Sequence, residues 1–218
     1  MRANGLGSNF GVYSSAMLDR DSLLTVLLVR HAESVAPGIS DFDEYTRPLT
    51  AKGIRDAEQL GESLASTHID AAYSSPYLRA RQTIEPIAKA RGLTVETIDD
   101  LRERLLSPVD LQDWRTALRR SWEDFDYAPP AGESSREAQA RVVRVLDKIR
   151  DRHSGGTVML ASHGNLIALA LNAIMPGVDY AFWESIPTPA VFTLSHDGDR
   201  WRVAEGSARA RDPSLRSG

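Results

Sequence analysis

The chain has 218 residues, of which 42% are hydrophobic and 26% are charged, a composition that fits one globular domain and excludes disordered, collagenous and membrane-spanning proteins. Its 26 Lys and Arg residues stand against 30 Asp and Glu residues, so a net charge of -4 provides no overall attraction to nucleic acid or to an anionic membrane. The absence of cysteine excludes disulfides, thiolate metal sites and cysteine nucleophiles.

The two ends of the chain differ in composition from its middle. Residues 1–22 and 206–218 are rich in Gly, Ser, Asn and Arg with little periodicity, so we predict flexible tails there and a single domain at 23–205. The first 22 residues lack the continuous apolar core of a signal peptide, which predicts a cytoplasmic protein.

Strands and helices alternate in the first half of the domain. Residues 23–29 are continuously apolar, as in a strand that is covered on both faces. Shorter strands are predicted at 69–74 and 93–98, with a helix between them that begins at Pro76. Another helix is predicted after Thr50, and its apolar face is formed by Ile54, Ala57, Leu60 and Leu64.

The alternation is interrupted once and then resumes. Residues 104–132 are predicted to form an inserted helical cap, in which the aromatic side chains serve packing rather than ligand binding. A capping box of Ser134 and Glu137 begins a helix that Gly155 and Gly156 end. It is followed by an apolar strand at 157–161, a helix at 166–174 that is apolar on all sides, and a hairpin at 190–204. Within the predicted cap at 104–132, the residues at helical spacing are Leu111, Trp114, Leu118 and Trp122.

This order of elements predicts an α/β fold. We expect a three-layer α/β/α sandwich with a mostly parallel central sheet, an antiparallel edge and the small helical cap insertion. In open sheets of this kind, ligands gather beyond the carboxyl ends of the strands. The residues directly after each predicted strand are therefore the candidate site residues.

Four predicted strand ends carry chemically useful side chains. The first apolar strand leads into Arg30 and His31, and the second leads into His163. These two histidines lie side by side if the two strands are neighbours. The strand at 69–74 leads into a helix whose first turn contains Arg79, where the helix dipole favours an anion, and the strand at 93–98 leads to Glu103.

These residue types suit phosphoryl transfer without a metal. Guanidinium groups offer forked donors that neutralise phosphoryl oxygens, which gives Arg30 and Arg79 that role. A neutral imidazole can attack phosphorus, and a carboxylic acid can protonate the departing alkoxide. His31 and Glu103 fit these two roles.

Four motifs succeed one another along the chain in the order and at the spacing of a known family. Together they resemble the histidine phosphatase superfamily, the phosphoglycerate-mutase-like proteins, from about residue 23 to residue 203. The motifs are Arg30-His31-Ala32-Glu33-Ser34, the segment Ser75-Pro76-Tyr77-Leu78-Arg79-Ala80-Arg81-Gln82-Thr83, Glu103 within Leu101-Arg102-Glu103-Arg104, and Ser162-His163-Gly164-Asn165.

The resemblance implies a phosphomonoester hydrolase that acts on a small phosphorylated metabolite through a covalent phosphohistidine, with no cofactor and no metal. Ser34 is a further predicted phosphate contact. The roles that the resemblance assigns are those of nucleophile for His31, of phosphoryl ligands for Arg30, Arg79 and His163, and of proton donor for Glu103.

Two other functions stay open. A phosphoglycerate mutase would pass the phosphoryl group to a second hydroxyl, and a binding module would hold a phosphorylated ligand without turnover. The mutase branch continues its signature with asparagines and an aromatic residue, whereas Ser34 precedes Val35-Ala36-Pro37-Gly38 here, which favours hydrolysis. Ala32 replaces the commoner glycine of the signature, with little expected effect. The oligomeric state is not indicated, and a homodimer is one option.

The remaining polar candidates receive plainer interpretations. Alternative acids to Glu103 are Glu33, Asp99 and Asp100. Arg81 and Arg104 are expected to be surface or supporting charges rather than phosphate ligands. The histidines expected to be solvated at helix ends or in a turn are His68, His153 and His196.

Overall fold

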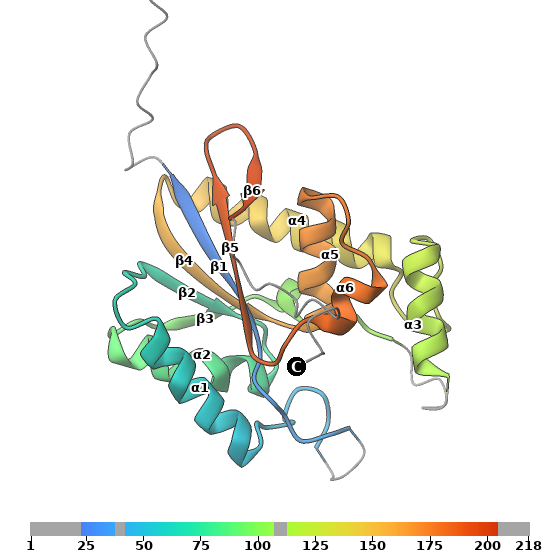
Figure 1. Ribbon diagram of the computed structural model, residues 1–218, viewed down its shortest axis with the longest axis horizontal. Coiled ribbons are helices and arrows are strands. Elements are labelled where there is room, and N and C mark those ends of the chain that lie inside the picture. Colours follow the sequence, from blue (N-terminus) through green and yellow to red (C-terminus); the bar gives the residue numbers. More distant parts are fainter. Residues whose placement is uncertain (1–22, 38–41, 107–112, 205–218) are drawn as a thin grey trace, which may run out of the picture.

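A computed structural model describes residues 23–37, 42–106 and 113–204 of the chain (Figure 1). The two predicted tails, and Leu111 of the predicted cap, lie outside these described residues. Within the described residues, no helix is both long and apolar enough to cross a membrane.

The centre of the domain is a mixed sheet. Its order is β3-β2-β4-β1-β5-β6, in which β3, β2, β4 and β1 are parallel and the hairpin β5-β6 adds an antiparallel edge beside β1. The predicted α/β fold with a mostly parallel sheet and an antiparallel edge is thereby confirmed. The strands are β1 (Leu24–Arg30), β2 (Ala71–Ser74), β3 (Val95–Thr97), β4 (Gly156–Ser162), β5 (Ala190–His196) and β6 (Trp201–Val203).

Helices cover both faces of this sheet. In Figure 1, α1 and α2 lie on one side, whereas α4 and α5 lie on the other. Two short elements, the 3-10 helix η2 (Asp99–Leu101) and α6 (Tyr180–Ser185), occupy connections. The longer helices are α1 (Ala51–Ser63), α2 (Leu78–Ala90), α3 (Trp114–Glu123), α4 (Ser135–Arg152) and α5 (Gly164–Ile174).

The two central strands supply side chains to both layers of the core. Val26 and Val158 pack with the apolar faces of α4 and α5, whereas Leu27 and Met159, one residue further along, pack with α2. Side chains of successive strand residues point to opposite faces, so a strand between two helical layers must be apolar throughout. Each fully buried aliphatic side chain of this kind contributes about 1.5–3 kcal/mol.

Helix caps lie where the sequence predicts them. The Thr50 Oγ1 accepts a hydrogen bond from the Gly53 backbone N–H at 3.0 Å, and Ser134 and Glu137 form the reciprocal capping box of α4. However, α4 ends at Arg152, before the glycine pair that was predicted to end it. Ile54 is 48% exposed, so its predicted place on the buried face of α1 is wrong.

The structure explains that error in α1. A Cβ added to Gly53 would lie 2.0 Å from the backbone oxygen of Glu33, so the helix approaches the chain after β1 too closely for any side chain at this position. Gly53 and Ala57, rather than Ile54, form the buried face. The contact fixes the start of α1 beside the segment that comes after His31.

The predicted helical insertion contains α3, which begins at Trp114. Leu118 is buried, and the half-buried Trp122 packs against the larger core cluster. Its ring also meets that of Phe125 at 5.8 Å between centroids. These contacts agree with the packing role predicted for Trp122.

His196 differs from its predicted surroundings, whereas Arg104 fits one of the two alternatives predicted for it. His196 is the last residue of β5 and is buried, with its ring 4.8 Å from that of Trp201, so its predicted solvated place in a turn is wrong. Arg104 is also buried and donates to the hydroxyls of Ser121 and Ser135. Of the two alternatives predicted for Arg104, this burial fits a supporting charge rather than a surface charge, and the side chain ties the segment after Glu103 to α3 and α4.

Candidate active site

The register of the central strands brings the two predicted site histidines together. Arg30, at the end of β1, pairs with Ser162, at the end of β4, and the backbone N–H of His31 donates to the Ser162 carbonyl at 3.1 Å. The next residue of each strand is therefore a histidine. The rings of His31 and His163 meet edge to face, with 5.1 Å between their centroids.

His31 is held as a neutral ring with one unprotonated nitrogen. Its Nδ1 lies 2.7 Å from the Ala32 carbonyl oxygen, and because a carbonyl only accepts, Nδ1 must carry the proton. Burial, together with the positive charges of Arg79 and Arg30, lowers the pKa of His31 to about 3. At neutral pH its Nε2 therefore keeps an unshared electron pair.

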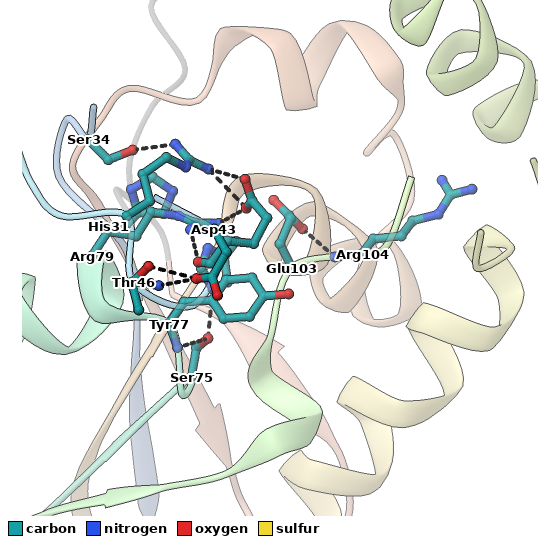
Figure 2. A network of polar contacts seen from close by, with 12 residues as sticks. His31, Ser34, Asp43, Thr46, Ser75, Tyr77, Arg79, Glu103 and Arg104 are labelled. Carbon is teal, nitrogen blue, oxygen red and sulfur yellow. Dashed lines mark hydrogen bonds and ion pairs between the residues drawn. The ribbon is translucent and has the colours of Figure 1, made fainter. Parts of the chain in front are cut away.

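His163 is fully buried, and its position depends on a serine. Its Nε2 lies 2.8 Å from the Ser75 Oγ, and the Tyr77 ring lies edge-on to it, with 5.0 Å between ring centroids. Burial and the neighbouring His31 lower the pKa of His163 well below its usual value. Figure 2 shows Ser75 and Tyr77 next to each other beside this part of the site.

Arg30 closes the side of the site that faces α5. Its Nη1 donates to the Ile186 carbonyl at 2.5 Å, which anchors the guanidinium beside the start of α5. A Cβ added to Gly164 would lie 2.9 Å from the Arg30 Cζ. Glycine after His163 thus gives this guanidinium its space.

Arg79 lies in the first turn of α2, as predicted, and is only 2% exposed. The Tyr77 ring lies 4.7 Å from its Cζ, in the range of a cation–π contact. Its terminal nitrogens donate to Glu44, to the backbone oxygen at 2.8 Å and to the carboxylate at 2.9 Å. Its burial lowers its pKa, although guanidinium stays protonated at any ordinary pH.

A third arginine, which the sequence reasoning missed, completes this group of cations. Arg47 is buried, and its Nη1 donates to the Ser34 Oγ at 2.9 Å and to the Val35 carbonyl at 2.8 Å. Its charge, with that of Arg79, contributes to the lowered pKa of His31. Ser34 thus lies at the edge of the site and contacts Arg47.

Glu103 approaches from η2, and Figure 2 shows it next to Tyr77. Its Oε1 accepts from the backbone N–H groups of Arg104 at 2.8 Å and of Leu166 at 3.1 Å. Among the described residues, its Oε2 accepts only from the Asn165 N–H, also at 3.1 Å. A carboxylate oxygen has about two acceptor positions, so Oε2 keeps one for a further partner.

The neighbours of Glu103 are engaged elsewhere. Arg102 pairs with Asp99 at 2.8 Å and lies 3.8 Å from Asp100, and Arg104 binds serine hydroxyls. Among the alternative acids, Glu33 accepts from the Thr50 hydroxyl at 2.7 Å. Asp99 and Asp100 thus face Arg102 and Glu33 is bound by Thr50, whereas Glu103 is held by backbone N–H groups and keeps an acceptor position toward the site.

Several buried nitrogens of the site have no hydrogen-bond partner among the described residues. Buried donors are almost always paired in folded proteins, so such a cluster indicates a missing acceptor, such as water or an anion. The unpaired atoms are the Nε of Arg30, of Arg47 and of Arg79, together with the Nδ1 of His163.

The side chains that were predicted to be exposed differ in their burial. Arg81 is exposed, as expected, and so is His68. His153 is half-buried, and its Nε2 lies 3.0 Å from the Tyr73 hydroxyl. Within the described ranges, no group of three or more His, Asp or Glu side chains is arranged to hold a metal ion.

Comparison with known proteins identifies the fold and the family. The sequence model of the histidine phosphatase superfamily (branch 1) matches residues 26–207. The chain belongs to this superfamily. Its solved relatives include YhfR of Bacillus stearothermophilus, with a TM-score of 0.70 and 28% identity over 86% of this chain and 98% of that one.

Relatives in this superfamily include proteins named as phosphatases and proteins named as phosphoglycerate mutases. Phosphoserine phosphatase 1 of Hydrogenobacter thermophilus is 29% identical over 83% of this chain and 90% of its own length. A probable phosphoglycerate mutase, GpmB of Salmonella paratyphi C, is 33% identical over 70% of this chain and 75% of its own length. Membership of the superfamily therefore supports phosphatase chemistry in general and leaves the choice between hydrolase and mutase to the site.

Proposed function

We propose that the protein is a phosphomonoester hydrolase in which His31 forms a transient phosphohistidine. The observation that carries this proposal is the state of His31. It is a neutral ring with Nδ1–H fixed on the Ala32 carbonyl and Nε2 free, beside three guanidinium groups. A free imidazole nitrogen is a nucleophile, and the cations offset the charge of the phosphoryl group that it attacks.

In the first step, the electron pair of His31 Nε2 forms a bond to phosphorus while the bond from phosphorus to the ester oxygen breaks. Arg30, Arg79 and His163 hold the nonbridging oxygens. The Ser75 hydroxyl donates a hydrogen bond to the His163 Nε2. The Nδ1 of His163 then carries the proton and donates a hydrogen bond to the phosphoryl group. Glu103 transfers its proton from Oε2 to the departing alkoxide.

In the second step, the Glu103 carboxylate takes a proton from a water molecule as this water attacks phosphorus. The bond between His31 Nε2 and phosphorus then breaks, the ring regains its electron pair, and inorganic phosphate leaves. Glu103 ends the cycle protonated, as it began. Every step uses side chains of this chain, and we propose that no cofactor or metal takes part.

The residues directly after the first motif favour hydrolysis over mutase chemistry. Val35 and Ala36 offer no side-chain donor for a phosphate-bearing second substrate. A binding module without turnover would need neither an unprotonated imidazole nitrogen nor a carboxylate with a spare acceptor position, whereas His31 and Glu103 supply both. We further propose a small phosphorylated metabolite as the substrate, in the cytoplasm, with no nucleic-acid or membrane partner.

The decisive experiment traps the intermediate. Radiolabelled phosphoryl substrate, quenched with alkali during turnover, should leave an acid-labile label on wild-type protein and none on His31→Ala. Hydrolysis of para-nitrophenyl phosphate should fall to background in the same variant and should be unaffected by a chelator in the wild type. Equal hydrolysis by the two proteins would refute the proposal, and isomerised product in place of free phosphate would make the protein a mutase.

A further inference from the structure

The carboxylate of Glu44 binds two arginines of the candidate site, Arg79 and Arg47. The Glu44 carboxylate accepts from the Arg79 Nη2 at 2.9 Å and from the Arg47 Nη2 at 3.0 Å to each of its oxygens. The Glu44 backbone oxygen also accepts from the Arg79 Nη1. The two arginines hold the pKa of Glu44 below its usual value, against the effect of its partial burial, so the carboxylate is ionised at neutral pH.

These contacts leave little of either guanidinium for a ligand. Both terminal nitrogens of Arg79 donate to Glu44, and those of Arg47 donate to Glu44, Ser34 and Val35. The Nε of each arginine is the nitrogen that has no partner among the described residues. A phosphoryl group that is to be held by the forked end of Arg79 must therefore take the place of a carboxylate.

The turn that carries Glu44 is built to present it. The Asp43 Oδ1 accepts from both the backbone N–H and the hydroxyl of Thr46, at 2.8 and 2.7 Å, which Figure 2 shows. The Tyr45 carbonyl accepts from the Leu78 N–H at the start of α2. The turn is thus fixed next to Arg79, so Glu44 lies within reach of the guanidinium.

The two partners differ in their freedom to move. The Arg79 side chain is 2% exposed, whereas that of Glu44 is 46% exposed. Arg79 is confined by its surroundings, but Glu44 can turn into solvent by side-chain rotation. When the pair separates, it is therefore Glu44 that leaves.

We propose that Glu44 is a specificity-determining residue, an internal anion that the phosphoryl group of the substrate must displace. This inference rests on the proposed hydrolase function and adds a substrate class to it. A dianionic monoester competes with a carboxylate for two guanidinium groups better than a singly charged diester does. Once displaced, Glu44 stays beside the site as a negative charge, which disfavours substrates that carry a second phosphate. The preferred substrates are thus monoesters with a single phosphoryl group.

Binding of inorganic phosphate, measured by titration calorimetry, tests the displacement without turnover. If the arginines are free of Glu44 about a tenth of the time, the apparent affinity of the wild type is lowered about tenfold. Glu44→Gln and Glu44→Ala should therefore bind phosphate on the order of tenfold more tightly. Glu58→Gln, which removes the same charge from an exposed position on α1, should bind as the wild type does.

The sign of the change separates this role from a merely structural one. If Glu44 instead positions Arg79 and Arg47 for phosphate, both variants bind it more weakly, and that result, or no change, would overturn the inference. A second measurement compares kcat/KM for a monophosphate and a bisphosphate of the same sugar, and Glu44→Gln should improve the bisphosphate more. Failure of the proposed function would appear separately, as absent turnover by the wild type.

Discussion

The Ser75 hydroxyl lies 2.8 Å from the Nε2 of His163, and it is the hydrogen-bond partner of that ring among the described residues. Ser75 also accepts from the Tyr77 N–H at 3.2 Å. This one side chain therefore connects the start of α2, which carries Arg79, to the end of β4, which carries His163. It fixes the orientation of a fully buried imidazole.

We expect Ser75→Ala to lower kcat by about 10- to 100-fold on a para-nitrophenyl phosphate assay, because the His163 ring loses the hydrogen bond that orients it. The effect should fall on kcat more than on KM, since orientation matters most when charge develops on the phosphoryl oxygens. Ser75→Thr keeps the hydroxyl and should recover part of the rate. Equal rates in wild type and Ser75→Ala would mean that the hydroxyl has only a packing role.

Glu103→Gln should slow the hydrolysis of alkyl phosphates by about 10²- to 10⁴-fold, because these leaving groups need a proton. It should slow para-nitrophenyl phosphate much less, since nitrophenolate departs without one. Measuring kcat/KM against leaving-group pKa checks this. Asp100→Asn is the matched control at a neighbouring acid, and a stronger leaving-group dependence in that variant would reassign the proton donor.

Gly164→Ala should displace Arg30 and leave the fold intact. The added methyl group would lie 2.9 Å from the guanidinium carbon, which is the mobile end of a side chain rather than backbone. We expect a loss of about 10-fold or more in kcat/KM, from the lost charged hydrogen bond to phosphate. Circular dichroism should be unchanged.

Gly61→Ala in α1 is the control for that substitution. A Cβ at Gly61 meets the Ile87 side chain at an ordinary 3.6 Å. Alanine is favoured over glycine within a helix by roughly 0.5–1 kcal/mol, so this variant should be somewhat more stable and fully active. A similar loss of activity in both variants would show that the effect of Gly164→Ala is not specific to Arg30.

The stability of the protein should fall as the pH is lowered below 6.5. The pKa of His31 is about 3 in the folded chain, against an ordinary value of 6.5, so between these values the unfolded chain binds a proton that the folded chain does not. His163 shifts in the same direction. Stability from these rings is complete above pH 6.5 and is lost toward pH 3, by at most about 1.4 kcal/mol per pH unit for each histidine.

Urea unfolding between pH 7 and 4.5 measures this dependence. The free energy of unfolding of His31→Asn should fall less steeply with falling pH than that of the wild type. The difference in slope should be at most about 1.4 kcal/mol per pH unit, which corresponds to one proton. Parallel pH profiles for wild type and His31→Asn would argue against a neutral ring at position 31.

The sequence predicts the parts of the site that strand ends supply. Arg30, His31 and His163 could be located because continuously apolar strands mark their own ends, and a parallel sheet aligns those ends. Arg79 could be located from its place in the first turn of a helix. Each of these residues can be located from the local sequence pattern of the strand or helix next to it.

Arg47, Glu44 and Ser75 have no such pattern. Arg47 and Glu44 lie on or beside a turn, where neither helical nor strand periodicity applies. Besides their contact with each other, Arg47 contacts Ser34, 13 positions before it, and Glu44 contacts Arg79, 35 positions after it. The role of Ser75 depends on a ring 88 positions distant. Such contacts arise only when the sheet has brought the segments together.

The error at His196 has a different cause, because a pattern was present. Ala190, Phe192, Leu194 and His196 alternate as buried residues along β5. Extending that alternation by one step places His196 in the core, although histidine beside Asp and Gly is typical of a turn. Strand parity outweighed local turn propensity here.

The ladder between β1 and β4 also bears on how this protein can change during evolution. His31, the proposed nucleophile, and His163 directly follow the two central strands, which are joined there by a backbone hydrogen bond that no side-chain replacement removes. The Asp43–Arg47 turn and the α3 region, by contrast, lie outside the central sheet. Mutations could thus alter which molecules are accepted while the reacting groups keep their places, so new selectivities can be acquired without rebuilding the chemistry.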